Sequence, residues 1–286
     1  MAAVGLVVLM IAVFGVFVAH GGDMAPVIKA APWEIAQIGG AAVAAALISN
    51  STATVKAGFG SAGRVFKGPT YHKDDYLQVI FLVSKLMKVL KAEGAVALEP
   101  HIENPESSAI FAEYPPLLAD HAVLALICDT IRLMVVSSGN LSPYAVEDLM
   151  TASIKNHHHH EMLQAAFWAG MEGALPALGI VACVLGVVKT MGAIDQPPPV
   201  LGALIGSALV GTFMGVLLAY GVAGPFAVRI AQIIDEDGEM LKCVQQLIVA
   251  NLHGHPMPLV IESARSVINS HSAPSFGEIF DGMRGK

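Results

Sequence analysis

The chain has 286 residues, of which 55% are hydrophobic and only 14% are charged, and its formal net charge is −7. So few charged side chains cannot cover the surface of an ordinary soluble domain of this length, so membrane insertion explains the composition better.

Four stretches lack Asp, Glu, Lys and Arg and are candidates for membrane-spanning helices: residues 1–22, 35–55, 173–188 and 196–228. The first stretch could instead be a cleaved signal peptide, but it has no basic n-region and is followed by no Ala-x-Ala site. We therefore predict four spans.

Basic residues are concentrated outside these stretches. Residues 56–172 hold nine of the sixteen Lys and Arg, and the tail after residue 228 holds five more. Because basic residues resist translocation, we expect the long loop, the tail and both termini to be cytoplasmic.

The loop and tail have helical patterns of their own. Apolar residues recur at helical spacing from Leu77 to Leu90, and we expect Gly94 to end that helix. A second helical stretch is expected at about 116–136, and a third begins at Ser142-Pro143. Residues 229–252 are expected to continue the fourth span as an amphipathic helix.

No β-strand pattern, nucleotide-binding glycine loop or internal repeat appears. We predict an all-α integral membrane protein with four transmembrane helices and a helical cytoplasmic domain between the second and third. Its expected parts are an outer helix pair with a short periplasmic connector (1–50), a cytoplasmic domain (51–165), an inner transmembrane hairpin (166–228) and a tail that completes the cytoplasmic domain (229–286). We expect no enzymatic activity, cofactor, bound metal or nucleic-acid partner.

Two of the spans are rich in small residues. Residues 39–46 are small on nearly every face, and the fourth span contains Gly202-x-x-x-Gly206 and Gly211-x-x-x-Gly215. Small residues let membrane helices approach closely, either within one chain or between chains. Spacing alone leaves both readings open.

The spans have no acidic residue well inside the membrane. We place Glu34 at the outer edge of the second span, Glu172 at the inner mouth of the third and His20 at the end of the first. An ion that crosses a membrane needs a titratable or anionic stopping point. We therefore expect the essential carboxylate to come from a partner.

The inner hairpin holds three candidate functional residues. Pro176 and Pro225 lie near its cytoplasmic ends, where each removes a backbone hydrogen bond and allows a bend, although prolines are also tolerated in membrane helices. Thr212 is the hydroxyl nearest the middle of the fourth span. It could donate to a partner's carboxylate or bond back to its own i−4 carbonyl.

Histidine and cysteine side chains give weak signals. Four adjacent histidines, His157 to His160, cannot all converge on one ion from a regular helix, so a solvated loop is favoured over a metal site. The cysteines, Cys128, Cys183 and Cys243, have no paired spacing and are predicted to be reduced thiols.

Motifs along most of the chain carry a family resemblance. The spans contain GGA (39–41), LPALGIVACVLGVV (175–188), LGALI (201–205) and VGTFMGVLLAYG (210–221), and the loop contains LEPHIENP (98–105) and IFAEYP (110–115). With these strings the chain resembles the MotA family of bacterial flagellar motor stator subunits, within the MotA/TolQ/ExbB proton channel superfamily.

The resemblance implies a multi-pass protein of the bacterial inner membrane, in contact with lipid, that serves flagellar rotation and chemotaxis. Five copies would surround two copies of MotB, whose membrane helices each bring the missing aspartate. Ion passage to and from that aspartate would turn the homopentamer, whose cytoplasmic domains push the rotor protein FliG.

The resemblance also assigns residues by position. Pro176 and Pro225 match the family prolines that couple ion flow to movement, and Thr212 matches the hydroxyl near the MotB aspartate. Lys91 and Glu99 match a basic and an acidic residue that contact the rotor, although many relatives have Arg at the first position.

The driving ion is expected to be the proton. Sodium-driven relatives usually have Thr seven residues after the third-span proline, and this chain has Cys183 there. Sulfur is a poor ligand for a hard cation such as sodium.

Three other functions fit the sequence less well than a stator does. An ExbB or TolQ type energiser has three spans with the large loop after the first, whereas two spans precede the loop here. A self-sufficient channel would need an intramembrane acid, and a purely structural scaffold would have no use for the proline pair.

Overall fold

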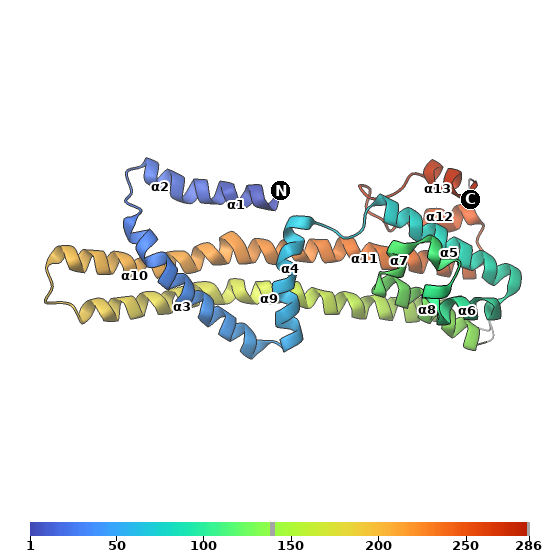
Figure 1. Cartoon of the computed structure of the whole chain (residues 1–286), viewed down its shortest axis with the longest axis horizontal. Coiled ribbons are helices and arrows are strands. Elements are labelled where there is room, and N and C mark those ends of the chain that lie inside the picture. The colour runs from blue at the N-terminus through green and yellow to red at the C-terminus, as the bar shows by residue number, and fades with distance from the viewer. Residues whose placement is uncertain (138–140, 285–286) are drawn as a thin grey trace. The chain divides into compact units, whose positions relative to one another are not determined.

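A computed structural model describes residues 1–137 and 141–284 of the chain. Within those residues every regular element is a helix, which confirms the all-α prediction (Figure 1). The helices form two compact units, each described by itself. The first unit is Met1–Gly68 with Glu161–Ile233, and the second is Pro69–His160 with Ile234–Lys286. Helices α9 and α11 contribute to both.

Four helices are long and apolar enough to cross a membrane, as the sequence predicted. The first is Ala2–Ala19, built from α1 (Ala2–Met10), a π-helical turn (Ile11–Gly15) and α2 (Val16–Ala19). The other three are α3 (Ala25–Ser49), α9 (Pro143–Met191) and the helix that begins as α10 (Pro198–Leu218).

The second span begins at Ala25, earlier than residue 35, where the sequence analysis placed its start. The Ala25 N–H donates to Oδ1 of Asp23 at 2.8 Å, and Pro26 suits the first helical turn. Glu34 is therefore the tenth residue of α3. The prediction that it lies at the outer edge of the span is wrong.

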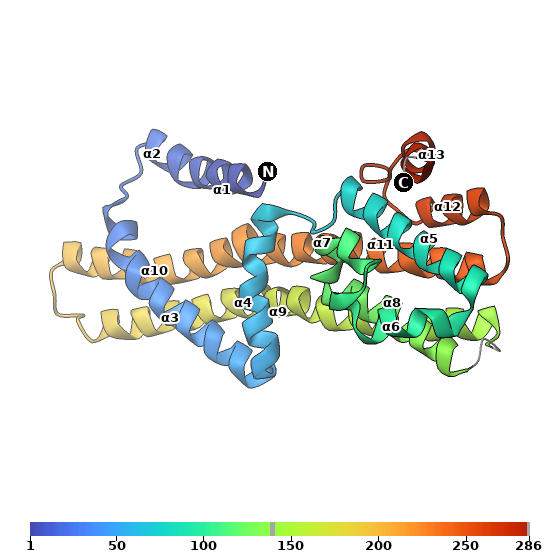
Figure 2. The same cartoon turned by 45° about the vertical axis from the view of Figure 1, so that its right-hand side comes forward.

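In the first unit α3 crosses the hairpin of α9 and α10, which run side by side (Figure 1 and Figure 2). The core between them consists mainly of small and branched side chains, including Ala30, Ile38, Ala42, Ala182 and Val210. Next in the chain comes α4 (Thr52–Lys67). It is capped by Ser51, which accepts from the Thr54 N–H at 3.1 Å, and Gly68 ends it with φ +87°.

The second unit begins with α5 (Lys73–Glu93), which ends at Gly94 as predicted; this glycine has φ +88°. Short elements follow: 3₁₀ turns at Ala95–Leu98, Pro105–Ser107 and Phe111–Glu113, and helices α6 (Glu99–Glu103) and α7 (Pro115–Leu118). The unit also holds α8 (His121–Val136), α12 (Met257–Arg265) and α13 (Phe276–Arg284).

The helical stretch expected at about 116–136 is interrupted. Asp120 has an extended backbone and accepts from the N–H groups of Ala122 and Val123 at 3.1 Å, so it caps a new helix instead of continuing the old one. Its other oxygen accepts from the hydroxyl of Tyr71 at 2.5 Å.

Two other predicted helices are confirmed. The third loop helix begins at Pro143 as α9, and the tail helix is α11 (Gly224–Leu252), whose apolar face is buried in the core of the second unit. The two units are defined by contacts between helices and not by the position of a membrane. The predicted boundaries between membrane and cytoplasmic parts, at residues 51, 166 and 229, therefore remain predictions.

The histidine run lies in α9 and not in a loop, which corrects the sequence analysis. His158 Nε2 is 3.5 Å from Oδ1 of Asp235, and the other three histidines are exposed. Within residues 1–137 and 141–284 no group of three His, Cys, Asp or Glu side chains could hold a metal ion.

Candidate functional site

The hairpin of α9 and α10 is held together by direct backbone contact. A Cβ added to Gly215 would lie 2.7 Å from the carbonyl oxygen of Leu175 and 2.9 Å from Cα of Gly179. A Cβ added to Gly179 would lie 3.0 Å from the carbonyl oxygen of Gly211. The Gly211-x-x-x-Gly215 pair therefore serves packing within one chain.

Other small residues of the spans remain open. A Cβ added to Gly39, Gly40, Gly202 or Gly206 would meet nothing within 4 Å. These positions leave room for a second helix to approach. The sequence alone could not divide the small residues between these two uses, because both need the same spacing.

Pro176 lies next to one of the close backbone contacts of the hairpin. It follows Leu175, whose carbonyl oxygen faces Gly215, and it is half-buried inside the continuous helix α9. Because proline has no N–H, the carbonyl of Glu172, four residues earlier, has no α-helical donor.

Pro225 directly follows a change of helix type. Residues Ala219–Ala223 form a π-helical turn between α10 and α11, and Pro225 is the second residue of α11. The π turn shifts the hydrogen-bond register just where a regular helix would need the N–H that proline lacks. Pro225 itself is exposed, and the next residue, Phe226, is buried.

The side chain of Glu172 reaches Gly224, the residue before the second proline. A Cβ added to Gly224 would lie 2.8 Å from Cδ and Oε1 of Glu172, so only glycine fits beside this carboxylate. Glu172 thus connects both prolines, through its backbone carbonyl to Pro176 and through its side chain to the neighbour of Pro225. The sequence alone predicted only that Glu172 lies at the inner mouth of the span.

Thr212 and Cys183 lie on facing helices of the hairpin, and both are half-buried. The Thr212 hydroxyl makes no hydrogen bond to any residue that the structure describes, whereas Thr190 bonds back to the carbonyl of Gly186 at 3.0 Å. The back-bonded alternative considered for Thr212 is therefore not adopted, and its hydroxyl is available.

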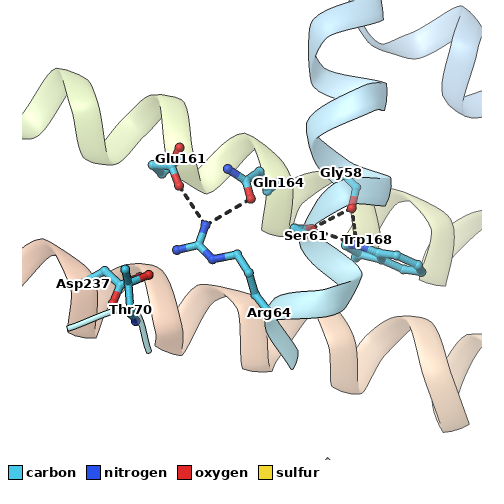
Figure 3. Close-up of polar contacts among 8 residues, drawn as sticks. All are labelled: Gly58, Ser61, Arg64, Thr70, Glu161, Gln164, Trp168 and Asp237. Atoms are coloured by element: carbon cyan, nitrogen blue, oxygen red, sulfur yellow. Dashed lines mark hydrogen bonds and ion pairs between the residues drawn. The ribbon is translucent and has the colours of Figure 1, made fainter. Parts of the chain in front are cut away.

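Helix α4 is fastened to α9 by polar contacts that the sequence analysis missed (Figure 3). Arg64 Nη1 donates to Oε2 of Glu161 at 2.8 Å and to Oε1 of Gln164 at 3.2 Å, and Trp168 Nε1 donates to the carbonyl of Gly58 at 2.9 Å. The only sequence signal is the spacing of three that puts Gly58, Ser61 and Arg64 on one helix face.

Aromatic rings extend this contact to the region of Pro225. The ring of Trp168 packs edge-on against Phe226, with centroids 5.2 Å apart, and Phe66 of α4 packs against Phe226 at 5.8 Å. The residue after Pro225 is therefore held by both α4 and α9.

The predicted rotor-contact residues lie in the second unit. Lys91 is exposed near the end of α5, and Glu99 is exposed at the start of α6. Neither has an ion pair or hydrogen bond among the described residues, in contrast to the nearby pair of Lys85 and Glu113 at 2.5 Å. Both charges are thus free to meet a partner.

In the second unit, two hydrogen bonds join Thr70, which lies just before α5, to Asp237 of α11. The N–H of Thr70 donates to Oδ1 of Asp237 at 2.7 Å, and its hydroxyl donates to Oδ2 at 2.8 Å (Figure 3). This two-point contact ties the segment before α5 to α11.

Comparison with known proteins agrees with these features. Residues 3–94 match the family described as Motility protein A N-terminal, and residues 121–242 match the MotA/TolQ/ExbB proton channel family. Motility protein A of Salmonella typhimurium is 37% identical over 280 residues, which cover 98% of this chain and 94% of that protein. Motility protein A of Escherichia coli is 36% identical with the same coverage.

Solved structures show the same fold. The structure of C. jejuni MotAB matches with a TM-score of 0.72 and 17% identity, over 94% of this chain and 95% of that one. The flagellar MotAB stator complex from Bacillus subtilis matches with a TM-score of 0.68 and 20% identity, over 91% and 92%. The chain therefore belongs to the motility protein A family and is a multi-pass inner-membrane subunit of the flagellar motor stator.

Proposed function

We propose that this subunit assembles with a MotB-type partner into a proton-driven complex that turns and exerts torque on the rotor protein FliG. The observation that carries the proposal is the interlocked hairpin of α9 and α10. It brings Pro176 of α9 and Thr212 of α10 onto two helices in direct backbone contact, with Pro225 near the start of α11, which continues α10. It also leaves the Thr212 hydroxyl without a partner among the described residues.

The partner supplies the membrane aspartate. The solved relatives are described as MotAB and as a MotAB stator complex. The open glycines at 39, 40, 202 and 206 leave room for helices of other chains. Five copies of the subunit are expected to form the ring, as in the family, with lipid around its outer helices.

The cytoplasmic part of the subunit contacts the rotor in this proposal. The excess of Lys and Arg in the long loop and the tail favours cytoplasmic termini. Lys91 and Glu99, exposed and unpaired among the described residues, are proposed to meet opposite charges on FliG. Pro176 and Pro225 are proposed to convert ion passage into motion of this side.

Cys183 supports the proton as the driving ion. A dehydrated sodium ion needs several oxygen ligands, and a thiol at this position supplies none. A proton needs only a group that can take it up and release it.

An ExbB or TolQ type energiser is less well supported. The match to Motility protein A N-terminal covers residues 3–94, where two spans precede the loop. A self-sufficient channel was opposed by the lack of an intramembrane acid, and the position of Glu34 within α3 weakens that argument.

Co-purification from the native host tests the proposal and decides between a stator and a channel. A tagged copy of the chain should recover a single-span protein with a membrane aspartate and a peptidoglycan-binding domain. Changing that aspartate to Asn should abolish rotation while the complex still forms. Rotation that persists with the Asn variant, or without any partner, would contradict the proposal.

A further inference from the structure

Glu34 meets the fourth span next to the candidate ion-pathway hydroxyl. A Cβ added to Gly211 would lie 2.6 Å from Oε2 of Glu34 and 3.2 Å from Cβ of Ala182. The carboxylate therefore fits into the space left by a glycine, where α3, α9 and α10 meet. Thr212 follows Gly211 in the chain, and Cys183 follows Ala182.

The contact lies deep in the spanning helices. Gly211 is the fourteenth residue of α10, so it lies about 20 Å along the axis from the first residue of that helix. The hydrocarbon core of a bilayer is about 30 Å thick. The side chain of Glu34 thus brings a carboxylate to the depth of Thr212, where the sequence analysis expected this chain to have none.

The buried oxygen of this carboxylate has no partner. Oε2 of Glu34 is shielded from solvent and accepts no hydrogen bond within residues 1–137 and 141–284. An unpaired buried acceptor is costly, and an unpaired buried charge costs more. A bound proton removes the charge of the Glu34 carboxylate and so lowers the cost of burying it.

The surroundings fit a proton better than a metal cation. Residues Pro198–Leu218 of α10 contain no charged or titratable side chain, and between residues 173 and 188 of α9 the only titratable group is the Cys183 thiol. On α3 the only other charged residue is Lys29, the first span (Ala2–Ala19) has no charged or titratable side chain, and His20 follows it. A bare cation would need several oxygen ligands around it. The Glu34 oxygen that faces Gly211 has no hydrogen-bond partner among the described residues.

We propose that Glu34 is a proton-binding site that this chain itself contributes to the ion route, at the level of Thr212. Its carboxylate takes up one proton from the outer side and releases one proton toward the carboxylate of the partner. The inference rests on the proposed function, because it adds a stopping point to the same route.

Rotation of tethered cells, corrected for the amount of complex in the membrane, tests the proposal. Glu34→Gln keeps the shape of the side chain but cannot bind and release a proton, and Glu34→Asp keeps the carboxyl group on a shorter stem. Asp195→Asn makes the matching change at an exposed carboxylate in the connector between α9 and α10.

We expect Glu34→Gln to slow rotation by at least about a hundredfold, the low end of the cost of removing a proton-transfer group. Glu34→Asp should restore part of the speed and change its dependence on external pH, while Asp195→Asn should rotate like the unmodified subunit. A purely structural role would lower the amount of complex equally in both Glu34 variants.

Three results would overturn the inference. The first is normal rotation with Glu34→Gln, and the second is a loss of speed that follows the loss of complex. The third is equal slowing in both Glu34 variants with unchanged pH dependence. In each case the proposed function stands if the unmodified subunit rotates with its partner and stops with the partner's aspartate-to-Asn variant. Failure of the unmodified subunit to rotate would overturn the proposed function itself.

Discussion

The carboxylate of Glu172 packs against Gly224, where an added Cβ would lie 2.8 Å from its Oε1. The backbone carbonyl of the same glutamate is the one that loses its helical donor to Pro176. The side chain of Glu172 thus contacts Gly224, the neighbour of Pro225, and its backbone carbonyl lacks the hydrogen bond that Pro176 cannot donate. We therefore expect a movement at either proline to displace Glu172.

Replacing either proline should uncouple ion flow from rotation. Pro176→Ala restores a backbone hydrogen bond to the Glu172 carbonyl, worth about 1 kcal/mol, so we expect at least about a fivefold loss of rotation speed. Pro225→Ala should act in the same way on the π turn before it. Speed is measured in tethered cells with matched protein levels. Pro199→Ala, in the exposed first turn of α10, serves as the control. Unchanged speed in both coupling variants would show that the prolines are only tolerated.

The glycine contact between α9 and α10 should be sensitive to a single methyl group. Gly215→Ala places Cβ 2.7 Å from a backbone carbonyl that cannot rotate away, and such overpacking typically costs about 1–3 kcal/mol. The purified complex should therefore melt at a lower temperature and be less abundant in membranes. Gly206→Ala adds the same methyl group where nothing lies within 4 Å of the same chain. If Gly206→Ala leaves the melting temperature of the isolated subunit unchanged but weakens assembly of the complex, position 206 faces another chain. An equal effect on the isolated subunit at both positions would contradict the described packing.

Charge reversal at the rotor contacts should lower motility without loss of the complex. Lys91→Glu and Glu99→Lys alter exposed charges with no partner among the described residues, so the fold loses no ion pair and should change by less than about 0.5 kcal/mol. Swarm diameter and the membrane content of the complex are the two readouts. Lys155→Glu, at another exposed and unpaired lysine, is the matched control. Partial rescue by opposite changes in FliG would support direct contact, and full motility of both variants would exclude it.

The last helix should loosen in acid. Lys73 Nζ donates to Oε1 of Glu278 at 2.5 Å, and the Ser275 hydroxyl and N–H donate to Oε2. These hydrogen bonds lower the pKa of Glu278 from 4.5 to about 2. Because the folded value lies below the ordinary one, the contact stabilises α13 above pH 4.5 and is lost as the pH falls toward 2. The protection factors of the amides in Phe276–Arg284, which are exchange rates corrected for their intrinsic dependence on pH, should be lower at pH 3 than at pH 7 in the purified complex, and Glu278→Gln should remove most of that difference. Equal protection factors at both pH values in the unmodified chain would contradict this assignment.

The apolar pattern of the sequence predicted the helices well, because long uncharged runs indicate membrane spans and helical periodicity indicates a helix with one buried face. The end of α5 at Gly94 and the start of α9 at Pro143 were predictable from local chemistry, because glycine tolerates the positive φ that follows a helix and proline suits the first helical position. The break at Asp120 was missed because it depends on a side chain that caps α8, and the same side chain also accepts a hydrogen bond from Tyr71.

The site was less predictable than the fold. Pro176, Cys183, Thr212, Pro225, Lys91 and Glu99 stood out mainly through family resemblance, and their roles remain predictions. The depth of Glu34 was misjudged because charge was taken to mark the end of a span, whereas Asp23 sets the start of α3. Its contact with Gly211 joins residues far apart in the chain, and no local pattern reports it.

Rotation speed of tethered cells that carry only this subunit and its partner as stator is the most direct test of a proton-driven motor. Sodium is varied at constant ionic strength, and a protonophore is then added. We predict that speed will not depend on sodium and will fall to zero with the protonophore. Speed that rises with sodium and survives the protonophore would contradict the account.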